Sequence, residues 1–447
     1  MVALRRAACP SGFSRKNAVF LNTEAQHQAH SVSIIEIENM YSAIHEFWTY
    51  TLFLGFQNPE FRQGARHPSP SSLRAGPTES TTMPRQSSTR YPAAYMRGGT
   101  SRAILFRGQD LPPDPAQWAD IFRCALGSPD SYGRQLDGLG GGISSLSKVA
   151  VITPSRRTDA DVDYHFFQVD PRTGAVLTRV NCGNISSAVG PFALSQGWIA
   201  DQEQCLARIY NVNSGKIIHA CFEQNPDVRN FIGIDGVHGM APRIRLRFLD
   251  PAASLAGRLF PTGRRQEALV VNGLGTVQAT LIDATLPTVI VDARSAGLRG
   301  DESPDELAGR MDYEALRIAA ALKMRLADDP RELHGEFANV PDVVFVSPAQ
   351  AGAIQARFYS SGNVHRAAPV TSSIALACAC HIEGTVAQAL IPGWQAREHQ
   401  AWKILHPAGT MEVGVRADAM AGQVASADVD RTARLIMLGS VVIPTCL

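Results

Sequence analysis

Two segments of the sequence place a reactive side chain beside groups that bind anions. In the first, Cys182 lies within Asn181-Cys182-Gly183-Asn184 and precedes the small-residue run 185–189, a pattern typical of a helix start. The unpaired N–H groups and positive dipole end of such a helix bind carboxylates and favour a thiolate, which can act as a general base on a carbon acid. We interpret Cys182 as a candidate catalytic residue and Asn181, Gly183 and Asn184 as candidate substrate ligands. A buried structural cysteine is the alternative.

The second segment leads into Lys148. It contains a glycine run that includes Gly141, followed by the hydroxyls of Ser144 and Ser145, and such a run can form a backbone nest for anions. The spacing is not that of a phosphate-binding P-loop. Lys148 precedes the apolar segment 149–152, where partial burial would lower the pKa of its amine and let it act as an acid or a base. A solvated lysine at a strand end is the alternative.

Two further segments combine cations with hydroxyl groups. One is the sequence MRGGTSR at 96–102, and the other is His365-Arg366 followed by hydroxyls at 371–373. Arginine in such a segment can bind a carboxylate bidentately. The candidate substrate ligands here are Arg97, Gly99, Thr100, Ser101, Arg102, His365, Arg366, Thr371 and Ser372. Several anion sites around one thiol and one amine would be explained by a small polycarboxylate substrate.

The elements that must position these residues alternate between strands and helices. Strands are predicted at 103–106, 149–152, 162–169 and 243–248. The last of these alternates strictly between apolar and basic residues, which predicts one solvated face. Asp114 as the N-cap and Pro115 at the first helical position predict a helix over 115–126. The pattern is that of an α/β protein.

A weak internal repeat divides the chain into two halves. The first half has a predicted strand near Leu105 and then the helix that Cys182 opens, and the second has a strand near Ile290 and then a helix that begins around Ser372. The two separations along the chain are similar. We expect two domains, residues 91–265 and 266–447, that face each other and aim two helix N-termini at a shared cleft.

Composition limits the classes of function. The chain has 447 residues, enough for two domains, and a net charge of +1, which argues against a nucleic-acid partner or a polybasic membrane contact. No apolar stretch reaches the roughly 18–20 residues of a membrane helix. The eight cysteines form no zinc or disulfide pattern, so we expect no metal, a reducing compartment and a cytoplasmic location. The assembly stays open, with a homodimer as one alternative.

The first 90 residues predict a poorly ordered extension. Segments rich in Ser, Thr and Pro at 68–72, 80–82 and 86–89 are typical of linkers. Basic residues at 5–6 and 15–16 favour a mitochondrial transit peptide, whereas acidic residues soon after them oppose it. We expect an extension with no catalytic role, with Met83 as an alternative start of the chain.

From about residue 91 to about residue 444, the chain resembles the 2-methylaconitate cis-trans isomerase family. The matching motifs are MRGGTS (96–101), GSPD (127–130), QLDGLGG (135–141), SKVA (147–150), NCGN (181–184), PTG (261–263), IDA (282–284), HPAG (406–409) and RTAR (431–434). The resemblance implies a diaminopimelate-epimerase-like fold, with two pseudo-symmetric α/β domains, each a mixed sheet around a central helix, and no cofactor. It also implies that Lys148 and Cys182 are the catalytic pair.

Two places depart from the family pattern. Lysine usually follows the GGTS motif, whereas this chain has Arg102, whose fixed planar fork suggests a different substrate choice. The true epimerases carry a second catalytic cysteine in the later half, where this chain has Thr371, Ser372 and Ser373. This difference argues against a two-thiol racemase and for a double-bond isomerase.

The sequence therefore predicts an isomerase of small unsaturated di- or tricarboxylic acids of the aconitate or methylaconitate type. Either Cys182 or Lys148 would remove an allylic proton, and the sequence leaves open which of them is the base. Two alternatives remain: an amino-acid epimerase on the same fold, and a carboxylate-binding protein without catalysis.

Overall fold

The structure is a computed structural model that describes residues 87–444 apart from 309, 311–312, 336 and 419. Its helices are α2 (Trp118–Leu126), α3 (Gly183–Ser195), α4 (Pro304–Leu307), α5 (Tyr313–Lys323), α6 (Val370–His381) and α7 (Val386–Ala389). Its strands are β1 (Ser88–Gly98), β2 (Ser101–Arg107), β3 (Lys148–Pro154), β4 (Val162–Val169), β5 (Val176–Leu177), β6 (Gln204–Asn211), β7 (Lys216–Glu223), β8 (Phe231–Gly233), β9 (Met240–Pro242), β10 (Ile244–Leu249), β11 (Glu267–Val271), β12 (Gly275–Ala284), β13 (Leu286–Asp292), β14 (Asp342–Pro348), β15 (Ala353–Ser360), β16 (Asn363–Val364), β17 (His399–His406), β18 (Gly409–Asp418), β19 (Gln423–Arg431) and β20 (Ala433–Pro444).

All of these strands except the β8–β9 hairpin belong to one 18-stranded mixed sheet. Its neighbours run β20-β1-β2-β3-β4-β6-β7-β10 and then β19-β18-β17-β15-β14-β13-β12-β11. Read inward from either edge, each half shows the same order: two antiparallel pairings, one parallel, one antiparallel, one parallel and two antiparallel. β10 and β19 pair antiparallel and join the halves. This repeated order confirms the predicted pseudo-symmetric α/β fold.

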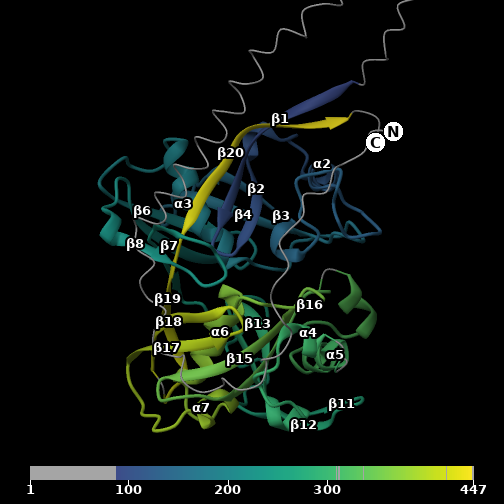
Figure 1. Cartoon of the computed structure of the whole chain (residues 1–447), viewed down its shortest axis with the longest axis vertical. Coiled ribbons are helices and arrows are strands. Elements are labelled where there is room, and N and C mark those ends of the chain that lie inside the picture. The colour runs from purple at the N-terminus through teal and green to yellow at the C-terminus, as the bar shows by residue number, and fades with distance from the viewer. Residues whose placement is uncertain (1–86, 309, 311–312, 336, 419, 445–447) are drawn as a thin grey trace, which may run out of the picture. The chain divides into compact units, whose positions relative to one another are not determined.

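The C-terminal strands cross back into the first half. β20 pairs with β1 over its whole length and takes the edge position that β11 has in the second half. In Figure 1 the yellow β20 runs upward beside β1, away from the lower half that holds β11 to β18. From Gln423 on, the chain forms β19 and β20, which hydrogen-bond to the first-half strands β10 and β1. The predicted domain boundary at residue 265 stays a proposal.

A central helix is enclosed by the strands of each half. α3 contacts β1, β2, β6, β7, β10 and β20. α6 contacts β12, β13, β17, β18 and β19, the equivalents of the first five of these, and also β14. All twelve residues of α6 are buried, as are ten residues of α3. Small side chains make this close enclosure feasible, which explains why both helices are rich in Ala and Ser, with Gly added in α3 and Cys in α6.

The outer face of each half carries a second, amphipathic helix. In the first half, Ala103 and Leu105 of β2 face the cluster around α3, whereas Ile104 and Phe106 pack with Phe122 of α2 on the other side. Because successive side chains of a strand point to opposite faces, a fully apolar strand is expected between two helical layers. α5 covers β11 and β14 in the second half.

The predicted local elements are confirmed with small shifts. β10 alternates between buried and exposed residues, as its sequence predicts. The predicted helix at 115–126 begins with a 3₁₀ turn, Pro115–Gln117, whose N-cap Asp114 accepts a hydrogen bond from the Ala116 N–H at 3.0 Å. No helix among the described residues is long and apolar enough to cross a membrane.

Strand β1 begins at Ser88, so regular structure starts before the predicted boundary at residue 90. The rest of the predicted extension lies outside the described residues. We expect a chain that begins at Met83 to fold and turn over like the full chain, since it keeps every β1–β20 pairing. Its thermal midpoint and specific activity should match those of the full chain. A matched chain that begins at Tyr95 loses most of β1 and should be insoluble or unfolded; if the Met83 chain behaved in the same way, the extension would be structural.

Candidate active site

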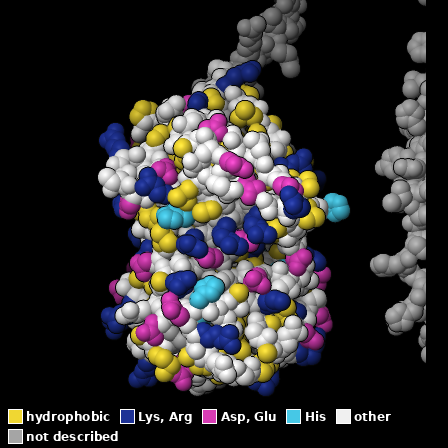
Figure 2. Space-filling view, turned by 90° about the vertical axis from the view of Figure 1, so that its left-hand side faces the viewer, with side chains coloured by type: hydrophobic (Ala, Val, Ile, Leu, Met, Phe, Trp, Pro, Cys, Tyr) yellow, Lys and Arg dark blue, Asp and Glu magenta, His cyan; other side chains and the backbone are white. Residues whose placement is uncertain are grey.

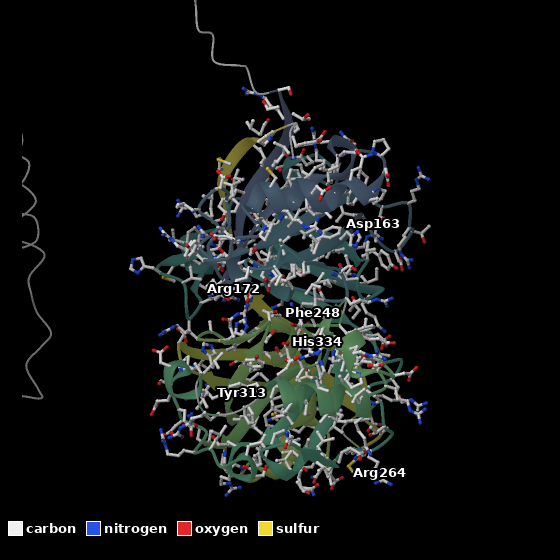
Figure 3. All side chains as sticks on the ribbon, turned by 90° about the vertical axis from the view of Figure 1, so that its right-hand side faces the viewer. Asp163, Arg172, Phe248, Arg264, Tyr313 and His334 are labelled. Atoms are coloured by element: carbon white, nitrogen blue, oxygen red, sulfur yellow. The ribbon has the colours of Figure 1, made fainter. Side chains whose placement is uncertain are left out.

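The N-termini of the two central helices meet between the halves. Cys182 is the N-cap residue of α3, and Pro369 is the N-cap residue of α6. A Cβ atom added at Gly183 would lie 2.5 Å from Cγ1 of Val370 and 3.2 Å from Cζ of Phe248, which Figure 3 labels at the junction of the halves. The two positive helix ends therefore point into one region, where they favour bound anions.

A small cavity at this junction brings Lys148 and Cys182 together. Its lining comes from both halves of the sheet. From the predicted set it includes Thr100, Ser101, Ser144, Ser145, Lys148, Asn181, Cys182, Gly183, Asn184, His365 and Thr371. The remaining polar residues of the lining are Gln168, Asn339, Asp342, Ser360 and Ser361. Segments far apart in the sequence thus share one buried polar cavity.

Lys148 is the first residue of β3, and its amine is buried. Nζ donates a hydrogen bond to Oε1 of Gln168 at 2.5 Å and lies 5.2 Å from the ring centroid of Phe166. The Gln168 amide is itself held, because Nε2 donates to the carbonyl oxygens of Ser147 and Ser144 at 2.9 and 3.1 Å. Burial lowers the pKa of Lys148, against the attraction of Cys182 and Asp342. The amine is therefore easier to deprotonate than an exposed lysine.

Cys182 directs its thiol toward the β1–β2 turn. Its Sγ lies 4.0 Å from Oγ of Ser101, and its side chain is 8% exposed. The carbonyl of Cys182 accepts hydrogen bonds from the N–H and the hydroxyl of Ser186, both at 3.2 Å, so the first turn of α3 is fixed. Within the described part of the chain, the Cys182 side chain makes no capping hydrogen bond at this helix end. The N–H groups of the first turn remain able to bind a ligand carboxylate.

The β1–β2 turn is fitted to the start of α3. Asn184 donates from Nδ2 to Oγ1 of Thr100 at 3.2 Å and accepts from the Thr100 N–H at 3.4 Å. Gly99 has φ of 50°, and a Cβ there would lie 2.0 Å from Oδ1 of Asn184. Only glycine meets both requirements. Gly99, a predicted substrate ligand, is absent from the cavity lining, and its place in the structure is the close contact of the turn with Asn184.

Other predicted ligands do not line the cavity. Arg97 donates to the carbonyl oxygens of Gly99 and Thr432, which fixes the turn. Arg102 lies with its guanidinium 5.5 Å from the ring centroid of Tyr95. Arg366 is 72% exposed and pairs with Asp305. Gly141 and Ser372 are also outside the lining, and the Ser372 hydroxyl donates to Oδ2 of Asp342 at 2.7 Å. The sequence could not distinguish arginines that bind ligand from those that hold backbone.

The sequence reasoning missed Asp342 and Gln168. A signal was present, because Asp342 precedes the apolar run 343–346 just as Lys148 precedes 149–152. His365, which was predicted, has its pKa lowered to about 4 by burial and by the nearby Lys148 ammonium. His365 is therefore neutral near pH 7.

A larger cavity of about 390 Å³ lies beside the first and shares Thr100 and Ala367 with it. Its charged and titratable lining residues are the carboxylates Asp235, Glu412, Asp428 and Asp430, the cations Arg245 and Arg431, and the histidines His399 and His406. Figure 2 faces the side where β17, β18 and β19 lie and shows acidic and basic side chains mixed across the middle of the molecule. Asp428 and Asp430 pair with Arg247 and Arg245, so the larger cavity carries charges of both signs. Lys148 and Cys182, the predicted acid–base pair, line the smaller cavity together with a single carboxylate, Asp342. The smaller cavity is therefore the candidate site.

Two facing α/β halves with acid–base groups in one buried cavity are the architecture of an acid–base enzyme that acts on a small anion. The chain belongs to the PrpF protein family, whose profile matches residues 88–444. It is 37% identical to a 2-methyl-aconitate isomerase of Cupriavidus necator, over 79% of this chain and 97% of that protein. It is 35% identical to a 4-oxalomesaconate tautomerase of Pseudomonas putida, over 79% and 96%.

A solved structure supports the same assignment. The crystal structure of a methylitaconate-delta-isomerase matches with a TM-score of 0.64 and 30% identity, and the match covers 80% of this chain and 96% of that one. These relatives confirm the family resemblance and the fold class. The chain is an isomerase.

The close approach of the two helix ends gives a testable constraint. We expect Gly183→Ala to destabilise the protein by about 1–3 kcal/mol, because the new Cβ overlaps Val370. In a double-mutant cycle measured by urea unfolding, Gly183→Ala should cost at least about 1 kcal/mol less in a Val370→Ala background than in the natural protein. Gly439→Ala, where nothing lies within 4 Å of the added Cβ, is the control and should be near neutral. Additive effects of the two changes would show that the helix ends are not in contact.

Asp342 gives a pH-dependent prediction. Burial raises its pKa from 3.8 to about 6, partly offset by the Ser360 and Ser372 hydroxyls and the Lys148 ammonium. Because the folded-state pKa is raised, the stabilising contribution of Asp342 is complete below about pH 3.8 and is lost as the pH rises through about 6. The change that Asp342→Asn makes to the free energy of unfolding should therefore be more stabilising at pH 8 than at pH 4, by up to about 3 kcal/mol. Asp305→Asn, at an exposed carboxylate, should show no such difference. An Asp342→Asn variant whose effect on the free energy of unfolding is the same at pH 8 as at pH 4, or less favourable at pH 8, would contradict the assignment.

Proposed function

We propose that this protein shifts or rotates the double bond of a small unsaturated di- or tricarboxylic acid of the aconitate or methylaconitate type, by allylic proton transfer. The observation that carries the proposal is the convergence of Lys148, Cys182 and two helix N-termini on one buried cavity. The named relatives support the substrate class, since they are isomerases or tautomerases of such acids.

The cavity supplies what a polycarboxylate needs. Backbone N–H groups at the two helix starts bind carboxylates, and Lys148 adds a cation. Hydroxyls of Thr100, Ser144 and Thr371 line the same space and can donate hydrogen bonds. With the substrate held by its carboxylates, an allylic CH₂ or CH₃ group would lie between the thiol and the amine.

The proposed reaction moves one proton in two steps. A base, either the Cys182 thiolate or the neutral Lys148 amine, removes a proton from the allylic carbon. The resulting carbanion is delocalised over the alkene and a carboxylate, and the helix ends stabilise the added charge. Return of a proton at the far carbon gives a shifted double bond, and return at the original carbon after rotation gives the cis-trans isomer. No electrons are exchanged, so the chemistry needs no redox cofactor.

An amino-acid epimerase on the same fold is the second candidate, and the structure of α6 disfavours it. Epimerisation by two thiols requires a second cysteine at the start of the second central helix. The N-cap position equivalent to Cys182 is Pro369, followed by Val370 and Thr371. Cys378 and Cys380 lie two turns further along α6, fully buried and outside the cavity lining.

We also propose a reducing, cytoplasmic location. The cysteines of the described residues are all unpaired, which is typical of proteins in a reducing compartment. Fractionation with an antibody to the full chain would test this, and recovery of the protein from an oxidising compartment would contradict it.

The direct test of the reaction is proton NMR of cis-aconitate with the full chain in heavy water. We expect the vinyl signal to move and deuterium to enter the CH₂ group, because the abstracted proton exchanges with solvent. Incubation with an α-amino acid such as proline is the parallel assay for the epimerase alternative. Deuterium incorporation into the amino acid, with none into cis-aconitate or methylaconitate, would contradict the proposed isomerase and favour the epimerase.

Cys182→Ser should abolish isomerisation while leaving substrate binding intact. A hydroxyl is nearly isosteric with the thiol but far less acidic, and loss of a general acid or base costs about 100- to 10,000-fold in rate. Single-turnover rates and calorimetric affinity for a saturated analogue should be measured together. Cys221→Ser, at an exposed thiol, is the matched control and should turn over normally. Normal turnover by the Cys182 variant would leave Lys148 as the candidate base.

A further inference from the structure

The pseudo-symmetry of the sheet gives Lys148 a counterpart in the second half. β3 and β14 occupy equivalent positions, each parallel to the neighbour on its edge side and antiparallel to the next strand inward. Lys148 is the first residue of β3, and Asp342 is the first residue of β14. Lys148 pairs in register with Gln168, and continuing the β14–β15 register beyond Val343–Tyr359 sets Asp342 opposite Ser360. Equivalent backbone positions in the two halves therefore carry a basic residue, Lys148, and an acidic residue, Asp342.

The two carboxyl oxygens of Asp342 differ in their hydrogen bonding to the protein. Oδ2 accepts the hydrogen bond from Ser372. Oδ1 is buried, and the Ser360 hydroxyl lies close enough to act on the carboxyl group, but Oδ1 has no partner with good hydrogen-bond geometry among the described residues. The side chain is 2% exposed and lines the candidate cavity. A buried oxygen without a partner is costly, so a ligand group is the natural partner for Oδ1.

The groups that face Asp342 set its charge. Its strand neighbours on β13 and β15, Thr288 and Ser360, are uncharged, as is Ser372 on α6. The titratable groups of the same cavity are Lys148 from β3, Cys182 from the start of α3, and His365. Lys148 alone can carry a positive charge there near pH 7, because His365 is neutral. One amine cannot offset both Asp342 and a substrate with two or three carboxylates.

We propose that Asp342 binds substrate in its protonated form, donating a hydrogen bond from Oδ1 to a substrate carboxylate, so that binding takes up one proton. This inference rests on the proposed substrate class. An ionised Asp342 would repel the incoming carboxylate in a low-dielectric cavity, whereas a carboxylic acid adds a donor. Its pKa of about 6 leaves the group mostly ionised above pH 7 in the free protein, so a bound substrate anion that raises this pKa further makes binding take up a proton.

The test is calorimetry of the full chain with propane-1,2,3-tricarboxylate, a saturated probe that cannot isomerise. Titrations at pH 8 in buffers of different ionisation enthalpy report protons taken up on binding. We expect uptake of close to one proton, and an affinity that falls about tenfold per pH unit between pH 7 and 8.5. Asp342→Asn keeps the acceptor for Ser372 and offers a permanent N–H donor. It should bind without proton uptake, with little pH dependence, and at least tenfold more tightly than the natural protein at pH 8.

The controls distinguish a failure of the proposed role of Asp342 from a failure of the proposed function. Asp305→Asn, at an exposed carboxylate outside the cavity, should leave proton uptake unchanged. Tight binding by the natural protein without uptake, or uptake that persists in Asp342→Asn, would overturn the role of Asp342 and leave the proposed function standing. Weaker binding by a folded Asp342→Asn variant would overturn it too. No binding of the probe at any pH would instead remove the proposed substrate class, and this inference with it.

Discussion

The site depends on one steric constraint, the contact between the first turns of two buried helices. Gly183 has no side chain, and a Cβ there would overlap Val370 at the start of α6. Because the two first turns can approach this closely, both positive helix ends act on the same small volume. Each helix end by itself would be an ordinary weak anion site. Together with a buried amine they form a cavity suited to several carboxylates.

The two halves share a backbone plan but differ in chemistry. Equivalent strand starts carry Lys148 and Asp342, and equivalent helix starts carry Cys182 and Pro369. A symmetric pair of thiols would suit removal of a proton on one face and its return on the other at a single carbon. An amine, a thiol and a carboxyl group with different proton affinities suit a reaction that moves a proton between unlike positions. This asymmetry within a repeated fold is the structural basis for placing the protein among double-bond isomerases.

The sheet explains how such a site is held. The β10–β19 pairing makes the two halves one sheet, and β20 closes the first half against β1. The chain therefore passes between the halves more than once, which limits how far they can separate. Phe248 of β10 packs near Gly183, so the joining strand also contacts the helix start. The geometry of the cavity is thus fixed by elements from the whole described chain rather than by one loop.

The sequence by itself determined the α/β class, the two-half organisation, the strands with clear alternation and the segments that carry Lys148 and Cys182. These follow from local rules: hydrophobic period, capping residues, and the small residues that a buried helix requires. Tertiary structure alone decided which polar residues share the cavity. Arg97 and Arg366 resemble carboxylate ligands in sequence, yet one holds a backbone turn and the other pairs with Asp305 at the surface. Asp342 precedes an apolar strand as Lys148 does, but it becomes a site residue only because the fold brings these two equivalent strand starts to one cavity. Burial and orientation are set by contacts between distant segments, and no local pattern encodes them.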